Sequence, residues 1–361
     1  MKRFLPATVS TLVAAAYVVY RLASTGWEPT GWLELGDRIS GGASEGSEGY
    51  DGQFFYYIAL DPDPSSVSAK LDDPAYRYQR ILYPLIARLV SLGVEARIPW
   101  AMLLIGLAAH WTGTWSVSEV LSDRGLSRWY ALSYGLWVGL VAPVGIGLSE
   151  PLAFALAAAG MLSLERRRKL SAAALFGAAA FAKETTLVFL AAALIVELLT
   201  DRQARAIAAY AASGALFGTW QLWLLGTFGA VGLRAGGDTA TAFEWIPFMG
   251  LFRVGFFSLA ALGLYLVIFG PSIVLPSIWG TVASVRELLR GARDAETLVL
   301  LGFCMLIMGL PFSTFREPLG LVRAADGLVL AAILFASARR WLRPLRYSLF
   351  WSAMLAMVLP R

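Results

Sequence analysis

The sequence has few of the residues on which many enzymes depend. It has one cysteine, Cys304, and one histidine, His110, and both lie inside apolar runs. A disulfide framework or a thiolate metal site needs several cysteines, so the composition excludes both. Metal sites built from several histidines are excluded for the same reason.

Charge is also scarce. Only 15% of the 361 residues are charged and 58% are hydrophobic, whereas a soluble domain has roughly 25% charged residues. Continuous apolar runs close to the ~20 residues needed to cross a bilayer recur along the chain. Continuous runs indicate helices, since a membrane barrel shows short alternating segments. We therefore expect one all-α polytopic membrane domain over residues 1–361.

About eleven transmembrane helices are expected from these runs, and the basic residues fall between them. Membrane orientation accounts for such basic residues, so we expect no nucleic-acid partner. Residues 271–285 are left open, either as the tail of the preceding helix or as an interfacial piece. The expected spans are 4–22, 98–120, 129–148, 151–164, 170–182, 185–199, 206–228, 247–270, 297–312, 319–338 and 347–359.

The distribution of charge predicts the orientation in the membrane. Lys2 and Arg3 place the N-terminus in the cytoplasm. The long polar segment 23–97 is then external, and residues 98–361 supply the remaining helices. Within this external loop, residues 54–60 and 81–92 are expected to form interfacial helices. We expect an integral protein of a bacterial plasma membrane, with its functional loop outside.

Asp51 is the candidate catalytic residue. It lies in the segment Gly49-Tyr50-Asp51-Gly52 of the external loop. Glycine lets the backbone approach a substrate closely, and a carboxylate at this position could accept a proton from an attacking hydroxyl. The alternative is an Asp-Gly turn that caps the following helix and has no further role. Tyr50 and Gln53 are candidate substrate-binding neighbours.

Arginines follow in the same loop. Arg77 and Arg80 are three residues apart, hence on one face if this segment is helical. The guanidinium fork suits a phosphate group. The alternative is that both arginines contact lipid headgroups at the membrane surface.

Further charged residues lie at the outer ends of the expected helices. Glu150 opens a helix after Ser149, and Lys183 and Glu184 share a tight turn. Each has a simpler interpretation, because Ser-Glu-Pro is an ordinary helix start and Lys-Glu can neutralise itself. Charges at this depth are costly, and they tend to mark a site or a water-filled cavity.

Arg316 and Arg323 complete the set of candidate substrate-binding residues. They are seven residues apart, on one face if helical. Asp326 follows Arg323 by three residues, so the alternative is a self-neutralising pair within the membrane.

The external loop resembles a known family. Residues 50–59, Tyr-Asp-Gly-Gln-Phe-Phe-Tyr-Tyr-Ile-Ala, and 78–85, Tyr-Gln-Arg-Ile-Leu-Tyr-Pro-Leu, resemble motifs of the GT-C superfamily of membrane glycosyltransferases. They are closest to the branch of the PIG-V-like mannosyltransferases, and Ser149-Glu150 is similar to a Ser-Glu in that branch. The chain has Tyr50 where that branch usually has Trp, and Tyr83-Pro84 in place of a longer aromatic-proline stretch.

The resemblance implies an inverting transfer of mannose or a similar sugar from a polyprenyl-phosphate donor to an external hydroxyl. Asp51 would be the general base, and the acceptor would be a lipid or a glycan. A monophosphate leaving group can be held by Arg77, Arg80, Lys183 or Arg316 without a metal. We therefore expect no metal or other cofactor, and membrane lipid as the surrounding partner.

Two other classes of protein remain open. A transporter or lipid flippase would place its important charges in the middle of the membrane, whereas these lie at the outer helix ends. A non-catalytic polyprenyl-lipid-binding protein would bind such a donor without turnover.

Overall fold

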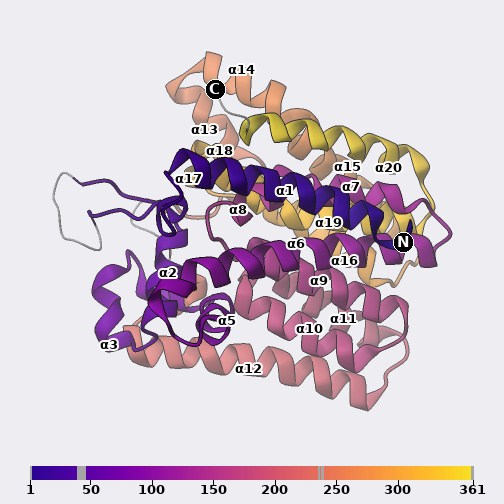
Figure 1. Ribbon diagram of the computed structural model, residues 1–361. Coiled ribbons are helices and arrows are strands. Elements are labelled where there is room, and N and C mark those ends of the chain that lie inside the picture. The colour runs from indigo at the N-terminus through magenta and orange to yellow at the C-terminus, as the bar shows by residue number, and fades with distance from the viewer. Residues whose placement is uncertain (1, 39–45, 235, 237–239, 359–361) are drawn as a thin grey trace.

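Helices form where the apolar runs predict them. The computed structural model describes residues 2–38, 46–234, 236 and 240–358, and these ranges contain helices and no strand, as expected for an all-α protein. The long helices run side by side, with the N-terminus at one end of the molecule and helix α2 at the other (Figure 1). They are α1 (Leu5–Ser24), α6 (Ile98–Asp123), α9 (Glu150–Glu165), α10 (Lys169–Ala182), α11 (Leu187–Leu199), α12 (Ala204–Phe228), α14 (Leu259–Phe269), α15 (Leu275–Leu289), α16 (Ala295–Met308) and α19 (Asp326–Ala338).

Three of the expected spans have a different form. Residues 129–148 are not one helix, because a 3-10 turn (Arg128–Ala131), α7 (Leu132–Gly135) and α8 (Val138–Val144) follow one another with breaks between them. Residues 247–270 divide at Ser258 into α13 (Met249–Phe257) and α14, and the described part of 347–359 is mostly a 3-10 helix. The segment left open, residues 271–285, is the tail of the preceding helix. A π-helical turn, Gly270–Val274, joins α14 to α15 in a single helix of 31 residues.

Among the described residues, three helices are long and apolar enough to cross a membrane: Lys2–Ser24, Leu259–Leu289 and Pro318–Ala338. A fourth is formed by α5 (Leu82–Ser91) and α6 if their 113° bend belongs to one span. These helices are compatible with insertion into a membrane. The expected count of eleven is not reached by this measure, since several expected spans form helices of fewer than 18 residues.

The described residues of the segment 23–97 contain short helices at the end opposite the N-terminus (Figure 1). Its α2 (Gly52–Leu60) does not lie on the surface as an interfacial helix, because seven of its nine residues are buried. A Cβ on Gly52 would lie 2.1 Å from the carbonyl oxygen of Ile146, so only glycine allows this approach. By contrast, α5 exposes Leu85 and Leu89 on one side, as an interfacial helix would.

The remaining short helices connect the long ones. Capping explains several of their starts, since Asp63 and Asp73 accept hydrogen bonds from backbone N–H groups in the first turns of α3 and α4. They are α3 (Pro64–Val67), α4 (Pro74–Tyr78), α13 (Met249–Phe257), α17 (Phe312–Arg316), α18 (Pro318–Ala324), α20 (Leu342–Ser348) and a C-terminal 3-10 helix η9 (Leu349–Val358).

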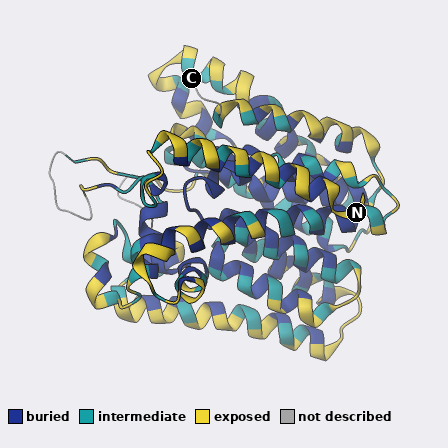
Figure 2. Ribbon diagram, in the orientation of Figure 1, coloured by how far each residue is buried: buried dark blue, intermediate teal, exposed yellow. Residues whose placement is uncertain are grey.

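Close packing of small residues holds the centre of the bundle. Helix α6 packs along α9, α9 along α10, and α16 along α19. Buried residues fill the middle of the bundle, while the outward faces of α1 and α12 are exposed (Figure 2). A Cβ on Gly327 would lie 1.9 Å from the ring of Phe303, so glycine brings α19 against α16.

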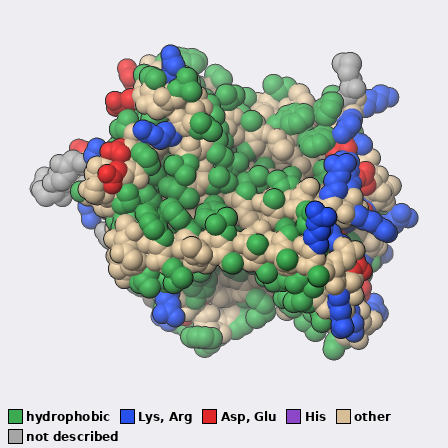
Figure 3. Space-filling view, turned by 90° about the horizontal axis from the view of Figure 1, so that it is seen from below, with side chains coloured by type: hydrophobic (Ala, Val, Ile, Leu, Met, Phe, Trp, Pro, Cys, Tyr) green, Lys and Arg blue, Asp and Glu red, His purple; other side chains and the backbone are tan. Residues whose placement is uncertain are grey.

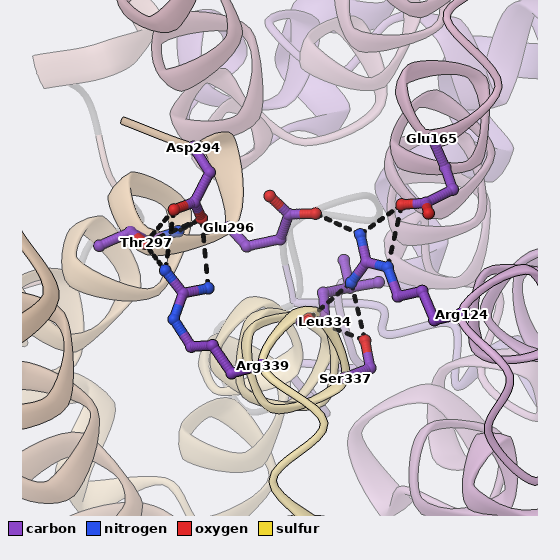
Figure 4. Close-up of polar contacts among 8 residues, drawn as sticks. All are labelled: Arg124, Glu165, Asp294, Glu296, Thr297, Leu334, Ser337 and Arg339. Atoms are coloured by element: carbon purple, nitrogen blue, oxygen red, sulfur yellow. Dashed lines mark hydrogen bonds and ion pairs between the residues drawn. The ribbon is translucent and has the colours of Figure 1, made fainter. Parts of the chain in front are cut away.

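Ion pairs tie the helix ends near the N-terminus. Arg124 at the end of α6 contacts Glu165, Glu296, the Leu334 carbonyl and the Ser337 hydroxyl, which belong to α9, α16 and α19 (Figure 4). Since its side chain is only 10% exposed, these contacts fix four helices relative to one another. We call this group the inner clamp.

Lys and Arg side chains gather at this same end, and hydrophobic side chains cover the middle of the face in Figure 3. Arg3, Arg128 and Arg166 all pair with Glu119 there. Arg3, which is expected on the cytoplasmic side, thus lies at one end of the molecule with basic residues that follow later helices.

Candidate functional site

Asp51 lies between two arginines at the end of the bundle opposite the N-terminus. Its Oδ1 is 3.0 Å from Nη2 of Arg77, and its Oδ2 is 3.0 Å from Nη2 of Arg323. Asp51 occupies the N-cap position of α2, but its side chain makes no capping hydrogen bond. The turn-cap interpretation is therefore insufficient, because the carboxylate is used for contacts between distant segments.

Arg77 is held from several sides. It donates to both carboxylate oxygens of Asp72, at 2.7 and 2.6 Å, and its guanidinium lies 4.2 Å from the centre of the Phe54 ring. The residue is 4% exposed, so it does not contact lipid headgroups. Its Nη1 has no hydrogen-bond partner. A buried guanidinium with a spare N–H is suited to an anionic oxygen.

Arg323 joins the segment 23–97 to the helices of the bundle. Its Nε donates to Glu150 Oε1 at 2.8 Å, and its Nη1 donates to the hydroxyl of Tyr50 at 2.9 Å. The self-neutralising pair with Asp326 does not form, since Asp326 instead accepts from the indole N–H of Trp137. Three of the sequence candidates, Tyr50, Asp51 and Glu150, thus converge on this one arginine.

Glu150 is shared by two cations. The ammonium of Lys183 lies 2.7 Å from the same Oε1 that Arg323 contacts. Glu150 Oε2 and the hydroxyl of Ser149, both fully buried atoms, have no partner. Buried polar atoms are nearly always satisfied, so these two are available to a ligand or to water.

A second ion pair lies beside the first. Arg80 donates to both oxygens of Glu184 at 2.8 Å, and to the hydroxyl of Tyr76 at 2.7 Å. Lys183 and Glu184 therefore do not neutralise each other, because each has its partner elsewhere. The neighbouring Thr185 hydroxyl is buried without a partner.

The arginines control the ionisation of Asp51. Burial alone would raise the pKa of this carboxyl, but the charges of Arg77, Arg323 and Arg80 outweigh burial and hold the pKa well below its usual value. Burial likewise raises the pKa of Tyr50, against the opposing effect of Arg323. Asp51 is thus an ionised carboxylate and Tyr50 a neutral phenol.

Two sequence candidates have other roles. The amide of Gln53 accepts from the backbone N–H of Gly36 and donates to the carbonyl of Glu48, so it holds the loop that precedes Asp51. The Arg316 side chain is exposed, and it takes no part in the ion pairs around Asp51. Its backbone carbonyl accepts from Tyr265.

Sequence reasoning missed some members of the site. Asp72 pairs with Arg77, and Tyr76 binds Arg80. Asp72 lies five residues before Arg77 and Tyr76 four residues before Arg80, and this closeness in sequence was a signal for both. Glu317, which accepts a hydrogen bond from Tyr50, is one of the charged residues at the expected outer helix ends, but its partner was not predicted.

A groove of about 740 Å³ lies next to Tyr50. Tyr50 and Glu317 form part of its wall, together with apolar residues of α1, α8, α14 and η9. Pockets of roughly 300–1,000 Å³ are the usual size for small-molecule sites. The ion-pair cluster therefore has a cavity on one side, with Tyr50 between the two.

Comparison with known proteins adds no identification. No family model matches the chain, and neither a curated protein nor a solved structure matches it significantly.

Proposed function

We propose that the protein is an inverting glycosyltransferase that moves a sugar from a polyprenyl-phosphate donor to an external hydroxyl, with Asp51 as the general base. The main support is the position of the Asp51 carboxylate, 3.0 Å from each of two buried arginines. A base and the groups that hold a leaving phosphate are thereby side by side. The sugar is mannose or a similar hexose, as the resemblance of the external loop implies.

The transfer uses these groups as follows. The acceptor oxygen forms a bond to the anomeric carbon, and the bond from that carbon to the phosphate oxygen breaks. The bonding electrons leave with the polyprenyl phosphate, while Asp51 takes the proton of the acceptor hydroxyl. Arg77, Arg80 and Lys183 stabilise the charge on the departing phosphate.

The charges of the cluster support a step in which the bound donor makes Asp51 a stronger base. Four cations, Arg77, Arg80, Lys183 and Arg323, are paired with four carboxylates, those of Asp51, Asp72, Glu150 and Glu184. Without substrate, Asp51 is a weak base because its arginines lower its pKa. A donor phosphate on the same arginines offsets their charge, which raises the pKa of Asp51 toward the range of an effective base.

The test is transfer of a labelled sugar by the purified protein in lipid bilayers. Mannosyl and other hexosyl polyprenyl phosphates serve as donors, and a lipid and glycan extract of bacterial envelopes serves as acceptor. Asp51→Asn is expected to lose roughly a hundredfold in turnover while donor binding is mostly kept. The matched control is Asp61→Asn, which changes an exposed carboxylate at the other end of α2.

Three results would contradict the proposal. Full turnover by Asp51→Asn would remove this carboxylate from the mechanism. Binding of donors by the wild type without any transfer would favour the non-catalytic lipid-binding protein. Sugar or lipid movement across the bilayer without chemical change would favour the transporter.

A further inference from the structure

The groove beside Tyr50 has two chemically different parts. Its body is apolar, with Ile146, Leu264, Ile268, Phe269 and Val358 among the lining residues. One end is polar, and there Arg21, Glu34, Tyr50 and Glu317 line the wall. An apolar groove with one polar end matches a molecule that has a hydrocarbon chain and a polar head.

The groove opens toward the surface that faces the lipid. Leu264 and Ile268 lie on α14, within the candidate membrane span Leu259–Leu289. Leu264 is 58% exposed, so its side chain borders both the groove and the outside of the bundle. The outer part of α1, α18 and the C-terminal segment are close to α14 at this end of the molecule (Figure 1). A chain can therefore enter sideways from the bilayer.

The polar end disfavours an anionic head. Arg21 pairs with Glu34 at 2.6 Å, and Glu317 accepts from Tyr50. This end therefore carries two carboxylates and one arginine, and the nearby Arg323 is already paired with Asp51 and Glu150. Carboxylates and phenols accept hydrogen bonds from hydroxyl groups, and the charge of the carboxylates repels phosphate.

We propose that this groove binds the acceptor, a lipid with one chain in the groove and an uncharged head that carries hydroxyl groups. This assignment to the acceptor rests on the proposed glycosyl transfer. The head lies against Tyr50 and Glu317. Because Arg323 binds both the hydroxyl of Tyr50 and the carboxylate of Asp51, the head is then one guanidinium group away from the proposed base. The donor phosphate then occupies the other side, where Arg77 and Lys183 lie.

Binding is measured with photoreactive alkyl lipids in bilayers, and without any donor. The probes are a hexadecyl glucoside, a hexadecyl phosphate of the same chain, and a chainless methyl glucoside as competitor. Cross-links to α1, α14 or η9 are expected for the glucoside, at least about tenfold above those for the phosphate, since a single unfavourable charge contact near the surface has this effect. The methyl glucoside is expected not to compete.

Substitutions in α14 provide a matched pair. Ile268→Trp fills the groove and is expected to reduce cross-linking of the glucoside by roughly tenfold or more. Val267→Trp is the control, because Val267 lies on the same helix, is 73% exposed and is not part of the groove lining. Glu317→Gln is expected to narrow the preference for the glucoside over the phosphate, since it removes one of the two carboxylates.

Several outcomes overturn this inference. These are equal labelling by the phosphate lipid, competition by the chainless sugar, or equal effects of the two tryptophan variants. Failure of glycosyl transfer is a separate result, since cross-linking needs no turnover. Conversely, transfer that proceeds equally well to methyl glucoside and is unaffected by Ile268→Trp would support the proposed glycosyltransferase activity. The same result would contradict the proposal that the groove binds a lipid acceptor.

Discussion

One oxygen of the Glu150 carboxylate is shared by two cations, and this arrangement predicts how much stability is lost when the cations are removed. Lys183 and Arg323 both contact Oε1 of Glu150, at 2.7 and 2.8 Å, and the Glu150 side chain is 1% exposed. In Lys183→Met or Arg323→Met, the other cation still pairs with Glu150. In the double variant neither cation remains, so a buried carboxylate is left uncompensated.

The expected magnitudes follow from this arrangement. Loss of one hydrogen bond to a charged group lowers the free energy of unfolding by about 1.5–3 kcal/mol. Arg323→Met is expected at the upper end, because Asp51 also loses a partner. Removal of the second cation isolates the buried charge, so this second step is more costly than the same change made alone, about 3–5 kcal/mol. The double variant is therefore expected to lose about 1–3 kcal/mol more than the sum of the two single variants.

A third substitution separates charge from packing. Addition of Glu150→Leu to the double variant removes the uncompensated charge, and it is expected to restore most of the excess loss, since apolar replacement of a buried ion pair is often neutral. The assay is denaturant unfolding in mixed micelles at pH 7, followed by tryptophan fluorescence. Additive single variants, or a triple variant no more stable than the double, would refute the reasoning.

Two further predictions concern pH and the inner clamp. The pKa of Asp51 is lowered from a usual value of 3.8, so its contribution to stability is present above that pH and is lost as the pH falls. Relative to Asp51→Asn, the free energy of unfolding of the wild type is expected to fall by up to about 1.4 kcal/mol per pH unit below pH 4. A difference between the two proteins that stays constant from pH 7 to pH 3 would contradict this. Arg124→Met is expected to lower the free energy of unfolding by about 3 kcal/mol, because Glu165 and Glu296 lose a buried partner. The control Arg290→Met, at an exposed i,i+3 pair, is expected to change it by less than about 0.5 kcal/mol. Equal losses would show that the inner clamp stabilises the protein no more than a surface ion pair does.

The sequence predicts much of the helical layout because local composition determines it. The expected spans 98–120, 151–164 and 206–228 correspond to α6, α9 and α12. Where the chain departs from the expectation, tertiary contacts decide. The span 129–148 breaks into short pieces, and α2 is buried because Gly52 fits against the Ile146 carbonyl.

The sequence predicts most residues of the candidate site but not which of them form ion pairs with one another. Charged residues at the expected outer helix ends indicate a site because charges are costly there. Their partners depend on how each helix is rotated in the bundle, which composition does not specify. Lys183 and Glu184 are neighbours in sequence, yet one pairs with Glu150 and the other with Arg80.

Gln53 and Arg316 show the limit of reasoning from proximity in sequence. Gln53 follows Asp51 by two residues, but its amide is engaged by Gly36 and Glu48. Arg316 lies in the same outer turn as Glu317, but its side chain is exposed. Without the fold, nothing distinguishes these residues from Arg77 or Arg323.

The pairing of Asp51 with Arg323 joins an early part of the chain to a late one. During synthesis, the carboxylate emerges long before the arginine that will neutralise it. A chain that stops before α18 leaves Asp51 with Arg77 alone and Glu150 with Lys183 alone. Truncated chains, and chains whose last helices are not packed in the bundle, therefore lack the complete ion-pair cluster. Activity of the protein then reports that α18 has packed against the rest of the bundle.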